Sequence, residues 1–219
     1  PDFAHQNLAN IEIPPITDRQ ESNKVRTPTP FSTTSYVGSE TCAGCHEVIA
    51  EQYRAHPMGR ATNTVTGASI VEDYEQTEFS PPGPRHYQVE KTSTGVIHHE
   101  VMLDTVGNVI YDQAEEIQYA VGSGQHGRTY LLKRGGSFFE SPITWYSQSH
   151  RWDLSPGYRP IAHERFGRQV TDNCLRCHVG QVVTDRPGSN RFPDPPFAEM
   201  AISCERCHGP GKRHVELNQ

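Results

Sequence analysis

The sequence is poor in apolar residues. Of its 219 residues only 34% are hydrophobic, and the mean hydropathy is -0.69, while 18 Gly and 17 Pro are typical of a chain rich in loops. Such a chain cannot bury much surface with side chains alone, so we expect a disulfide, a metal or a cofactor to supply part of the interior. The chain is nevertheless not of the disordered class, because it has 9 Tyr, 8 Phe, 2 Trp and several strand-like runs.

Two further absences limit the partners. The formal net charge is -6, which argues against nucleic acid as a partner. No apolar run approaches the roughly eighteen residues that a membrane helix needs, so we expect no membrane span. The chain also has no initiator Met and no hydrophobic signal region at its start, and we expect a mature, processed product that begins at Pro1.

The six cysteines form three CxxC pairs, and none is left over. A histidine follows each pair at once, in "CAGCH", "CLRCH" and "CERCH". A redox disulfide needs only one such pair, so three pairs are more than this function requires. Zinc is the stronger alternative, because two CxxC pairs are also a zinc-ribbon signature, but zinc does not require a histidine directly after each second cysteine. The cysteines are Cys42, Cys45, Cys174, Cys177, Cys204 and Cys207.

Covalently attached heme accounts for all three histidines. The two thiols add to the two vinyl groups of a heme, and the two intervening residues span the gap between those vinyls. The next residue then lies under the iron and binds it through imidazole. The motifs therefore predict three c-type hemes, bound by the six cysteines and ligated by His46, His178 and His208. Because this attachment takes place outside the cytoplasm, we expect a periplasmic or extracellular protein.

The pattern along the chain predicts an α+β, loop-rich fold. Residues 1–35, rich in Pro, Thr, Asn and Gln, are expected to be an extended arm, either a loose terminus or a segment that wraps a neighbouring subunit. Residues 36–219 are expected to form one triheme domain with a heme-packed core and short helices at the CxxCH sites. A helix from Cys42 ends at "HPMG", and residues 86–147 read as inserted antiparallel strands, in which Ile97, His99, Val101 and Leu103 share a face.

Nine histidines remain as candidates for the distal positions. If residues 46–56 are helical, His46 and His56 are about 15 Å apart along the axis and rotated by about 280°, so they cannot ligate one iron from opposite sides. His56 would therefore serve another heme, although a histidine can also cap a helix end. The six-residue loop from His208 to His214 is too short to pass round a porphyrin, so His214 would also serve another heme. His126 lies among glycines, where a backbone can approach a flat cofactor.

The other candidates are weaker. His163 and His150 come next, and His5 would be a ligand donated across a subunit boundary. Met58 is disfavoured because His56 beside it is the better donor. A last group is expected to lie on the sheet surface: His86, His98 and His99.

Several stretches resemble the multiheme cytochromes related to cytochrome c554, which are often fused to tetratricopeptide repeats. They are "YVGSETCAGCHEVIAEQYRAHPMG", "VGSGQHGRTYLL", "ITWYSQSHRWDLSPGY" and "ISCERCHGPGKRHVE", and the resemblance covers roughly residues 36–216. It implies that the histidines of "HPMG", "GSGQHG" and "KRH" are distal ligands. The sequence departs from the family pattern in its long arm and in ending at "HVELNQ", where relatives often continue into repeats.

The leading functional hypothesis is electron transfer, because an iron with two histidine ligands has no open position for substrate. An alternative is an oxidoreductase for nitrogen compounds, in which one five-coordinate heme faces a pocket lined by Arg128, Tyr130, His150 or His163. A third hypothesis, compatible with the first, is a subunit of a homo-oligomer or filament joined by the arm. The expected partners are other redox proteins or copies of the chain itself.

Overall fold

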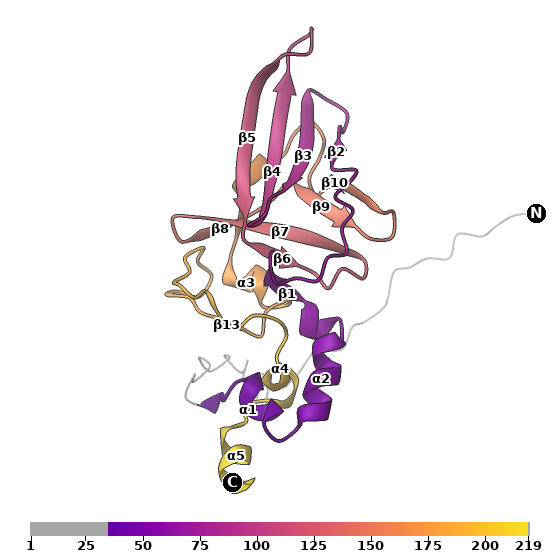
Figure 1. Ribbon diagram of the computed structural model, residues 1–219. Coiled ribbons are helices and arrows are strands. Elements are labelled where there is room, and N and C mark those ends of the chain that lie inside the picture. Colours follow the sequence, from indigo (N-terminus) through magenta and orange to yellow (C-terminus); the bar gives the residue numbers. More distant parts are fainter. Residues whose placement is uncertain (1–34, 219) are drawn as a thin grey trace, which may run out of the picture. The chain divides into compact units, whose positions relative to one another are not determined.

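The computed structural model describes residues 35–218, which contain short helices and many antiparallel strands (Figure 1). The helices are α1 Ser39–Ala43, α2 Glu47–Ala55, η2 Met58–Arg60, η3 Arg165–Gly167, α3 Asp172–Leu175, α4 Cys204–His208 and α5 Lys212–Asn218. The strands are β1 Thr62–Thr64, β2 Glu78–Phe79, β3 Arg85–Lys91, β4 Val96–Leu103, β5 Val109–Ile117, β6 Tyr119–Val121, β7 Gly127–Arg134, β8 Ser137–Glu140, β9 Ile143–Tyr146, β10 Arg151–Leu154, β11 Arg168–Val170, β12 Gln181–Val182 and β13 Phe197–Glu199.

The strands form three sheets. The largest has the order β1-β6-β7-β8-β11, and β9 joins it by pairing with both β7 and β10. The second sheet has the order β2-β3-β4-β5, and β12 pairs with β13 in the third. Every pairing is antiparallel. The mixed, loop-rich α+β class expected from the sequence is therefore confirmed.

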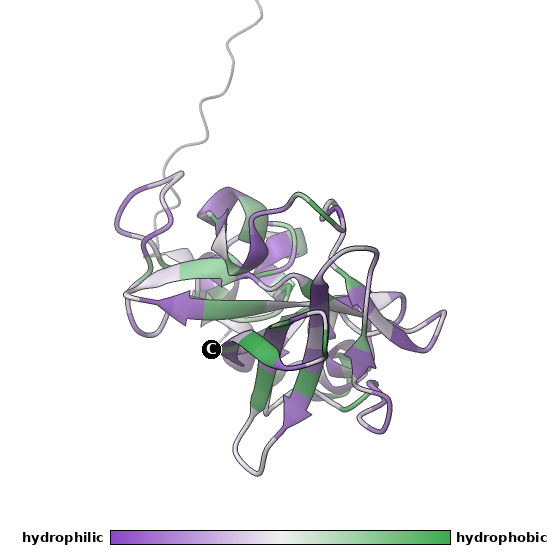
Figure 2. Ribbon diagram, turned by 90° about the horizontal axis from the view of Figure 1, so that it is seen from above, coloured by the Kyte–Doolittle hydropathy of each residue, from purple (hydrophilic) through white to green (hydrophobic). Residues whose placement is uncertain are grey.

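The largest sheet is covered on both faces. Along β7, Tyr130 and Leu132 belong to one hydrophobic cluster and Leu131 to another, as the two-residue repeat of a strand requires. The first cluster also takes residues from the four-stranded sheet, including Tyr87. The second takes residues from α3 and the segment after it, including Leu175. The segment of the second CxxCH motif therefore packs against a side-chain core. In Figure 2, strands of the sheets carry hydrophobic residues, coloured green.

The face of β4 that is buried carries two polar side chains. Val96, His98 and Glu100 are buried, whereas the alternate set that begins at Ile97 is only half-buried. Ser141 Oγ lies 2.7 Å from His98 Nδ1, and the hydroxyl of Tyr87 donates to Glu100 Oε2 at 3.0 Å. The expectation that His98 lies on the sheet surface is wrong, because these partners compensate for the lost hydration of the polar side chains.

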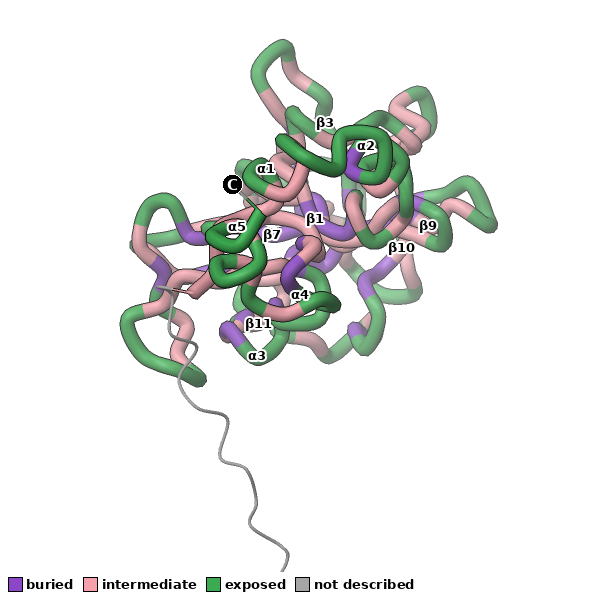
Figure 3. Tube along the Cα trace, turned by 90° about the horizontal axis from the view of Figure 1, so that it is seen from below, coloured by how far each residue is buried: buried purple, intermediate pink, exposed green. Residues whose placement is uncertain are grey.

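The helices of the first motif, and the helix that follows the third motif, have almost no side-chain core. Within α1 and α5 no residue is buried, and in α2 only Ala50 is. Val48 and Ile49 of α2 are 66% and 65% exposed. Figure 3 shows the same contrast, with α2 and α5 coloured mainly as exposed and the buried segments concentrated in the sheets. Side chains alone therefore do not pack this part of the chain.

The predicted helix boundary and most of the predicted strands agree with the structure. The helical segment ends before "HPMG", although it is divided into α1 and α2 by the turn at Gly44. The strand region is wider than residues 86–147, because β1 and β2 precede it and β10 and β11 follow it. These added strands are two to four residues long, too short for a clear alternation, and two of them, β1 and β11, pair with strands distant in the chain. The expected arm, residues 1–35, lies outside the described part of the chain except for its last residue.

Among residues 35–218 no helix is long and apolar enough to cross a bilayer.

Burial of His98 generates a prediction about pH. Burial lowers the pKa of His98 to about 3, whereas an unfolded histidine titrates near 6.5. Between these values the unfolded chain binds a proton that the folded chain does not, so the folded state loses stability as the pH falls below about 6.5. From pH 7 to pH 5 this residue should remove about 2 kcal/mol from the free energy of unfolding.

The measurement is denaturant unfolding of the holoprotein at both pH values. A His98→Asn variant should lose this part of the pH dependence. A His86→Asn variant on the neighbouring strand should keep it, because His86 is not fully buried. Equal pH dependence in the wild type and the His98 variant would contradict the prediction.

Candidate functional site

The first CxxCH motif occupies the break between two helices. Cys42 is in the last turn of α1, Cys45 follows in the turn, and His46 is the N-cap of α2. The amide of His46 donates to Cys42 O at 2.9 Å, and the amide of Ala50 donates to His46 O at 2.9 Å. These bonds close the turn and place both thiols and the imidazole on one short loop.

The second motif is anchored in the side-chain core. Leu175, between Cys174 and Cys177, is 2% exposed, and Val179 after the motif is 1% exposed. Buried Asp172 accepts hydrogen bonds from Arg176 Nη2 at 2.9 Å and from the amide of Gly188 at 2.7 Å. Both cysteines nevertheless remain exposed. The motif therefore presents its thiols on a rigid support.

The third motif forms α4 and lies against the first. The hydroxyl of Tyr53 in α2 donates to Ile202 O at 3.0 Å, and the amide of Cys204 approaches Ser39 Oγ at 3.4 Å. Burial raises the pKa of the Cys42 thiol, and the neighbouring Cys204 and Glu205 raise it further. Residues more than 150 positions apart are thus brought side by side.

Two residues inside the third motif, which the sequence reasoning did not single out, connect it to the other motifs. Arg206 donates from Nη2 to Arg176 O, in the second motif, at 2.7 Å. Glu205 accepts hydrogen bonds from the amides of Val37 and Gly38, just before the first motif. The CxxCH pattern places no demand on the two middle residues, so no signal in the sequence marked them.

His214 faces the first motif rather than the third. It lies on α5, and its ring centroid is 6.2 Å from that of His46, with 22° between the two ring planes. The predicted ligand of the first motif and a predicted distal histidine are therefore brought together, although they are 168 positions apart in the chain.

His56 is the exposed C-cap of α2. Its ring is nearly parallel to that of Tyr53, with 6.0 Å between the ring centroids, and its Nδ1 accepts from the amide of Met58 at 3.3 Å. Because Tyr53 contacts the segment of the third motif, His56 lies beside that motif. Met58, the disfavoured alternative to His56 as a ligand, is 48% exposed.

His126 lies on an exposed loop that two neighbouring residues hold in place. The amide of Ser147 donates to His126 O at 3.0 Å, and the side chain of Ser147 donates to Gly124 O at 2.6 Å. Gln148 Nε2 is 3.0 Å from His126 Nδ1. Glycine is required at position 124, where φ is +85° and a Cβ would lie 2.7 Å from Val71.

The weaker candidates are not brought to a CxxCH motif by any contact within the described residues. His163 Nε2 lies 2.9 Å from the hydroxyl of Tyr87, and its Nδ1 accepts from the amide of Arg165 at 2.9 Å. His150 is exposed and has its ring edge-on to Trp145. His5 lies outside the described residues.

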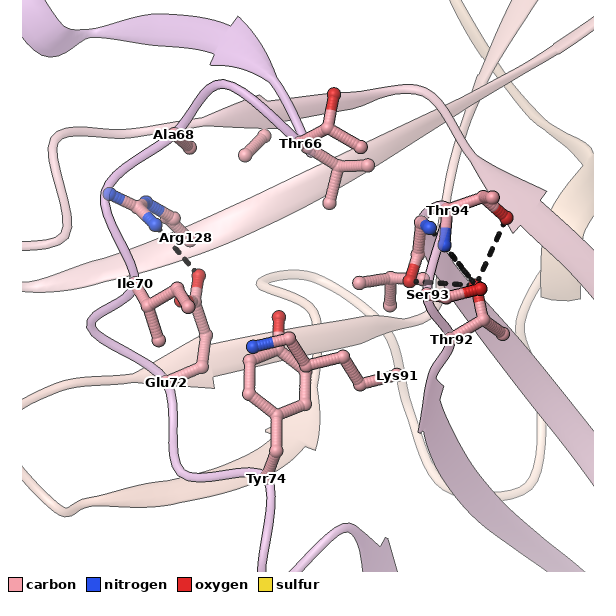
Figure 4. Close-up of a pocket in the computed structure, with 14 residues that line it drawn as sticks. Thr66, Ala68, Ile70, Glu72, Tyr74, Lys91, Thr92, Ser93, Thr94 and Arg128 are labelled. Atoms are coloured by element: carbon pink, nitrogen blue, oxygen red, sulfur yellow. Dashed lines mark hydrogen bonds and ion pairs between the residues drawn. The ribbon is translucent and has the colours of Figure 1, made fainter.

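Two cavities, of about 200 Å³ and about 170 Å³, adjoin each other beside β7. Arg128 lines both, but it is 3% exposed and its Nη1 forms an ion pair of 2.8 Å with Glu72 Oε1 (Figure 4). The hydroxyl of Tyr130 donates to the same oxygen at 2.8 Å. The two residues proposed for an enzyme pocket are therefore engaged with Glu72, and neither cavity is lined by His150 or His163.

The donor set fits covalently attached heme. All six cysteines are free thiols, and four of them are exposed. No group of three or more His, Cys, Asp or Glu side chains among residues 35–218 is arranged to hold a bare metal ion. Exposed apolar side chains on α2, such as Val48 and Ile49, provide a surface that a flat apolar cofactor would cover.

Comparison with known proteins agrees with this chemistry. Residues 155–209 match the family model of cytochrome c554 and c-prime. The crystal structure of the outer cell wall cytochrome OcwA is similar in fold, with a TM-score of 0.50 and 20% sequence identity over 84% of this chain. The match covers 34% of the OcwA chain, so this chain spans about a third of that protein's length. A comparison with curated protein sequences found no match.

The family match confirms the resemblance to multiheme c-type cytochromes that the motifs indicate. It also supports covalently bound heme c as the cofactor and heme-based electron transfer as its use. The match includes both the second and the third motif, from Cys174 to His208.

The buried pair of Glu72 and Arg128 is predicted to support the fold. Replacing Glu72 by Ala should lower the free energy of unfolding by about 3–5 kcal/mol, because it leaves the buried guanidinium without its counter-ion. Urea unfolding of the holoprotein measures the change. A Glu40→Ala variant is the control, because Glu40 pairs with Arg54 at the surface and should cost less than about 1 kcal/mol. Similar losses in both variants would contradict the prediction.

Proposed function

We propose that this chain, a relative of the cytochromes c554, transfers electrons through three covalently bound, closely packed c-type hemes with mainly bis-histidine ligation. The observation that carries the proposal is the pairing of His46 with His214 beside the first CxxCH motif. The contacts of the third motif with the other two support close packing of the hemes, since Glu205 reaches the first motif and Arg206 the second. When bound, heme supplies reversible one-electron chemistry.

The distance between His46 and His214 supports their role as two axial ligands of one iron. A bond between a metal and an imidazole nitrogen is about 2 Å long, and that nitrogen lies roughly 1 Å from the ring centre, so two opposed imidazoles have centres about 6 Å apart. The observed separation is 6.2 Å. His214 is thereby assigned to the heme of the first motif and not to that of His208.

The other distal positions are assigned to His56 and His126. His56 lies beside the third motif through Tyr53, which supports a role at a heme other than the first. His126 is on the exposed loop held by Ser147 and Gln148, and its Nε2 has no hydrogen-bond partner within the described residues. A held, exposed imidazole with a free nitrogen suits an axial ligand.

Electron transfer accounts for the site better than substrate chemistry. Two histidines on each iron leave no position for a substrate, and low reduction potentials are expected for such ligation. The enzyme alternative requires one five-coordinate heme with polar groups beside it. Arg128 and Tyr130 do not supply that environment, because Glu72 holds both.

A location outside the cytoplasm, with redox proteins as partners, follows from the same chemistry. Heme c is attached outside the cytoplasm, and the solved structure of similar fold is an outer cell wall cytochrome. We therefore place this chain in the periplasm or outside the cell.

The heme count and the role of His214 can be tested together. The pyridine hemochrome assay should give three hemes per chain, and the oxidised wild type should show low-spin spectra. A His214→Ala variant should keep three hemes but make one of them high-spin, because the iron above His46 loses its second imidazole. His150→Ala is the control and should remain low-spin. A different count, or a low-spin His214 variant, would contradict the proposal.

Assembly through the N-terminal arm is the second part of the proposal. Deleting residues 1–30 should abolish self-association of the holoprotein without changing its heme content. Size-exclusion chromatography with light scattering measures the former, and the hemochrome assay measures the latter. If the shortened chain assembles as the full chain does, the arm does not join subunits.

A further inference from the structure

One carboxylate connects the segment before α1 with the segment before α5, which are remote in the chain. Glu205 Oε1 accepts from the amide of Val37 at 3.0 Å and from the amide of Gly211 at 2.7 Å. Glu205 Oε2 accepts from the amide of Gly38 at 2.9 Å and also lies 3.2 Å from the amide of Val37. All these partners are backbone donors, which an ionised carboxylate binds most strongly.

This carboxylate is buried and has no cationic side chain beside it. Glu205 is 4% exposed. Among residues 35–218 no Lys, Arg or His side chain forms an ion pair with it. Its negative charge is therefore met only by the dipoles of amide groups and stays largely unscreened by solvent.

The bonded segments lead to the two sides of the first heme site. Val37 and Gly38 immediately precede α1, which carries Cys42, and the chain then reaches His46. Gly211 immediately precedes α5, which carries His214. Glu205 itself lies between Cys204 and Cys207. One side chain of the third motif thus holds both segments that bring His46 and His214 together.

The backbone around Glu205 is packed as closely as glycine permits. A Cβ on Gly211 would lie 3.1 Å from Val37 Cγ2 and 3.2 Å from Glu205 Oε1. Gly38 has a φ of +84°, in the region that favours glycine. A second carboxylate adds to the connection, because Glu199 Oε1 accepts from the amide of Ser39 at 2.7 Å. Three successive amides, at positions 37, 38 and 39, are therefore bound by carboxylates.

We propose that Glu205 is a positioning residue that sets the ligand geometry of the first heme and lowers the reduction potentials of the hemes at the first and third motifs. The inference rests on the proposed function, because it concerns the same hemes. Reduction of ferric to ferrous heme adds one electron and lowers the charge of the site by one. A fixed, buried negative charge nearby opposes that change, so the oxidised form is stabilised relative to the reduced form.

The test compares Glu205→Gln with a matched control, Glu51→Gln, in the full-length holoprotein. Glutamine keeps the size of the side chain but removes the charge, and its NH₂ group cannot accept from an amide. Glu51 is exposed on α2, and its substitution by Gln changes the net charge by the same amount as Glu205→Gln does. Potentiometric titration with dithionite as the reductant and ferricyanide as the oxidant gives the midpoint potentials. Hydrogen exchange at the amides of Val37, Gly38 and Gly211 reports on the connection itself.

In the Glu205 variant, with three hemes still bound, the midpoint potentials of two hemes should rise and exchange at these amides should accelerate about tenfold, since charge-assisted hydrogen bonds are lost. Glu51→Gln should leave exchange unchanged and shift the potentials less. Unchanged exchange would overturn the positioning role, and potentials shifted no more than in the control would overturn the redox role.

Failure of the proposed function would look different. A wild-type heme count other than three, or a five-coordinate heme in the wild type, would refute the proposed function. Hydrogen exchange at the amides of Val37, Gly38 and Gly211 would still test whether Glu205 holds the two segments. A Glu205→Asp variant separates the effect of the charge from a general loss of structure, because it keeps the negative charge on a shorter side chain. It should accelerate exchange while shifting the potentials less than Glu205→Gln does, and equal potential shifts would overturn the redox role.

Discussion

The arrangement of the candidate heme sites depends on one buried carboxylate, that of Glu205. Its backbone belongs to the third CxxCH motif, and its two oxygens bind amides that precede the first motif and α5. The adjacent Arg206 reaches the backbone of the second motif at Arg176. The third motif is therefore the point at which all three motifs meet. Under the proposed function, which requires closely spaced hemes, Glu205 and Arg206 supply the hydrogen bonds that join the third motif to the segments of the other two.

The chain has two kinds of interior. The sheets contain an aromatic core of their own, around Trp145, Tyr130 and Phe138, all at most 1% exposed. Helices α1 and α2 at the first motif, and α5 after the third, bury almost no side chain, and Val48 and Ile49 of α2 remain exposed. In the proposed holoprotein, flat apolar cofactors provide the contacts that side chains provide in the sheets.

Local patterns predicted those features that depend on near neighbours. Pro57 stops α2 from continuing because it has no amide N–H to donate, and alternating residues indicated β3, β4 and β5. The burial of His98 could not be predicted in this way. From the sequence, a polar residue is expected at the surface unless its distant partner is known, and that partner is Ser141, in the connection between β8 and β9. The short strands β1 and β11 were missed for the same reason, because distant pairing alone holds them.

The sequence by itself determined the chemistry of the candidate site, because heme attachment is encoded within five consecutive residues and repeats three times. It also predicts that His214 does not serve the heme of His208, since a six-residue loop is too short to pass round a porphyrin. Only the tertiary structure decided which site His214 faces and that Glu205 connects the segments around it. These relations join residues up to 168 positions apart, and no local pattern records them. They arise from packing and long-range hydrogen bonds, which depend on the whole folded chain.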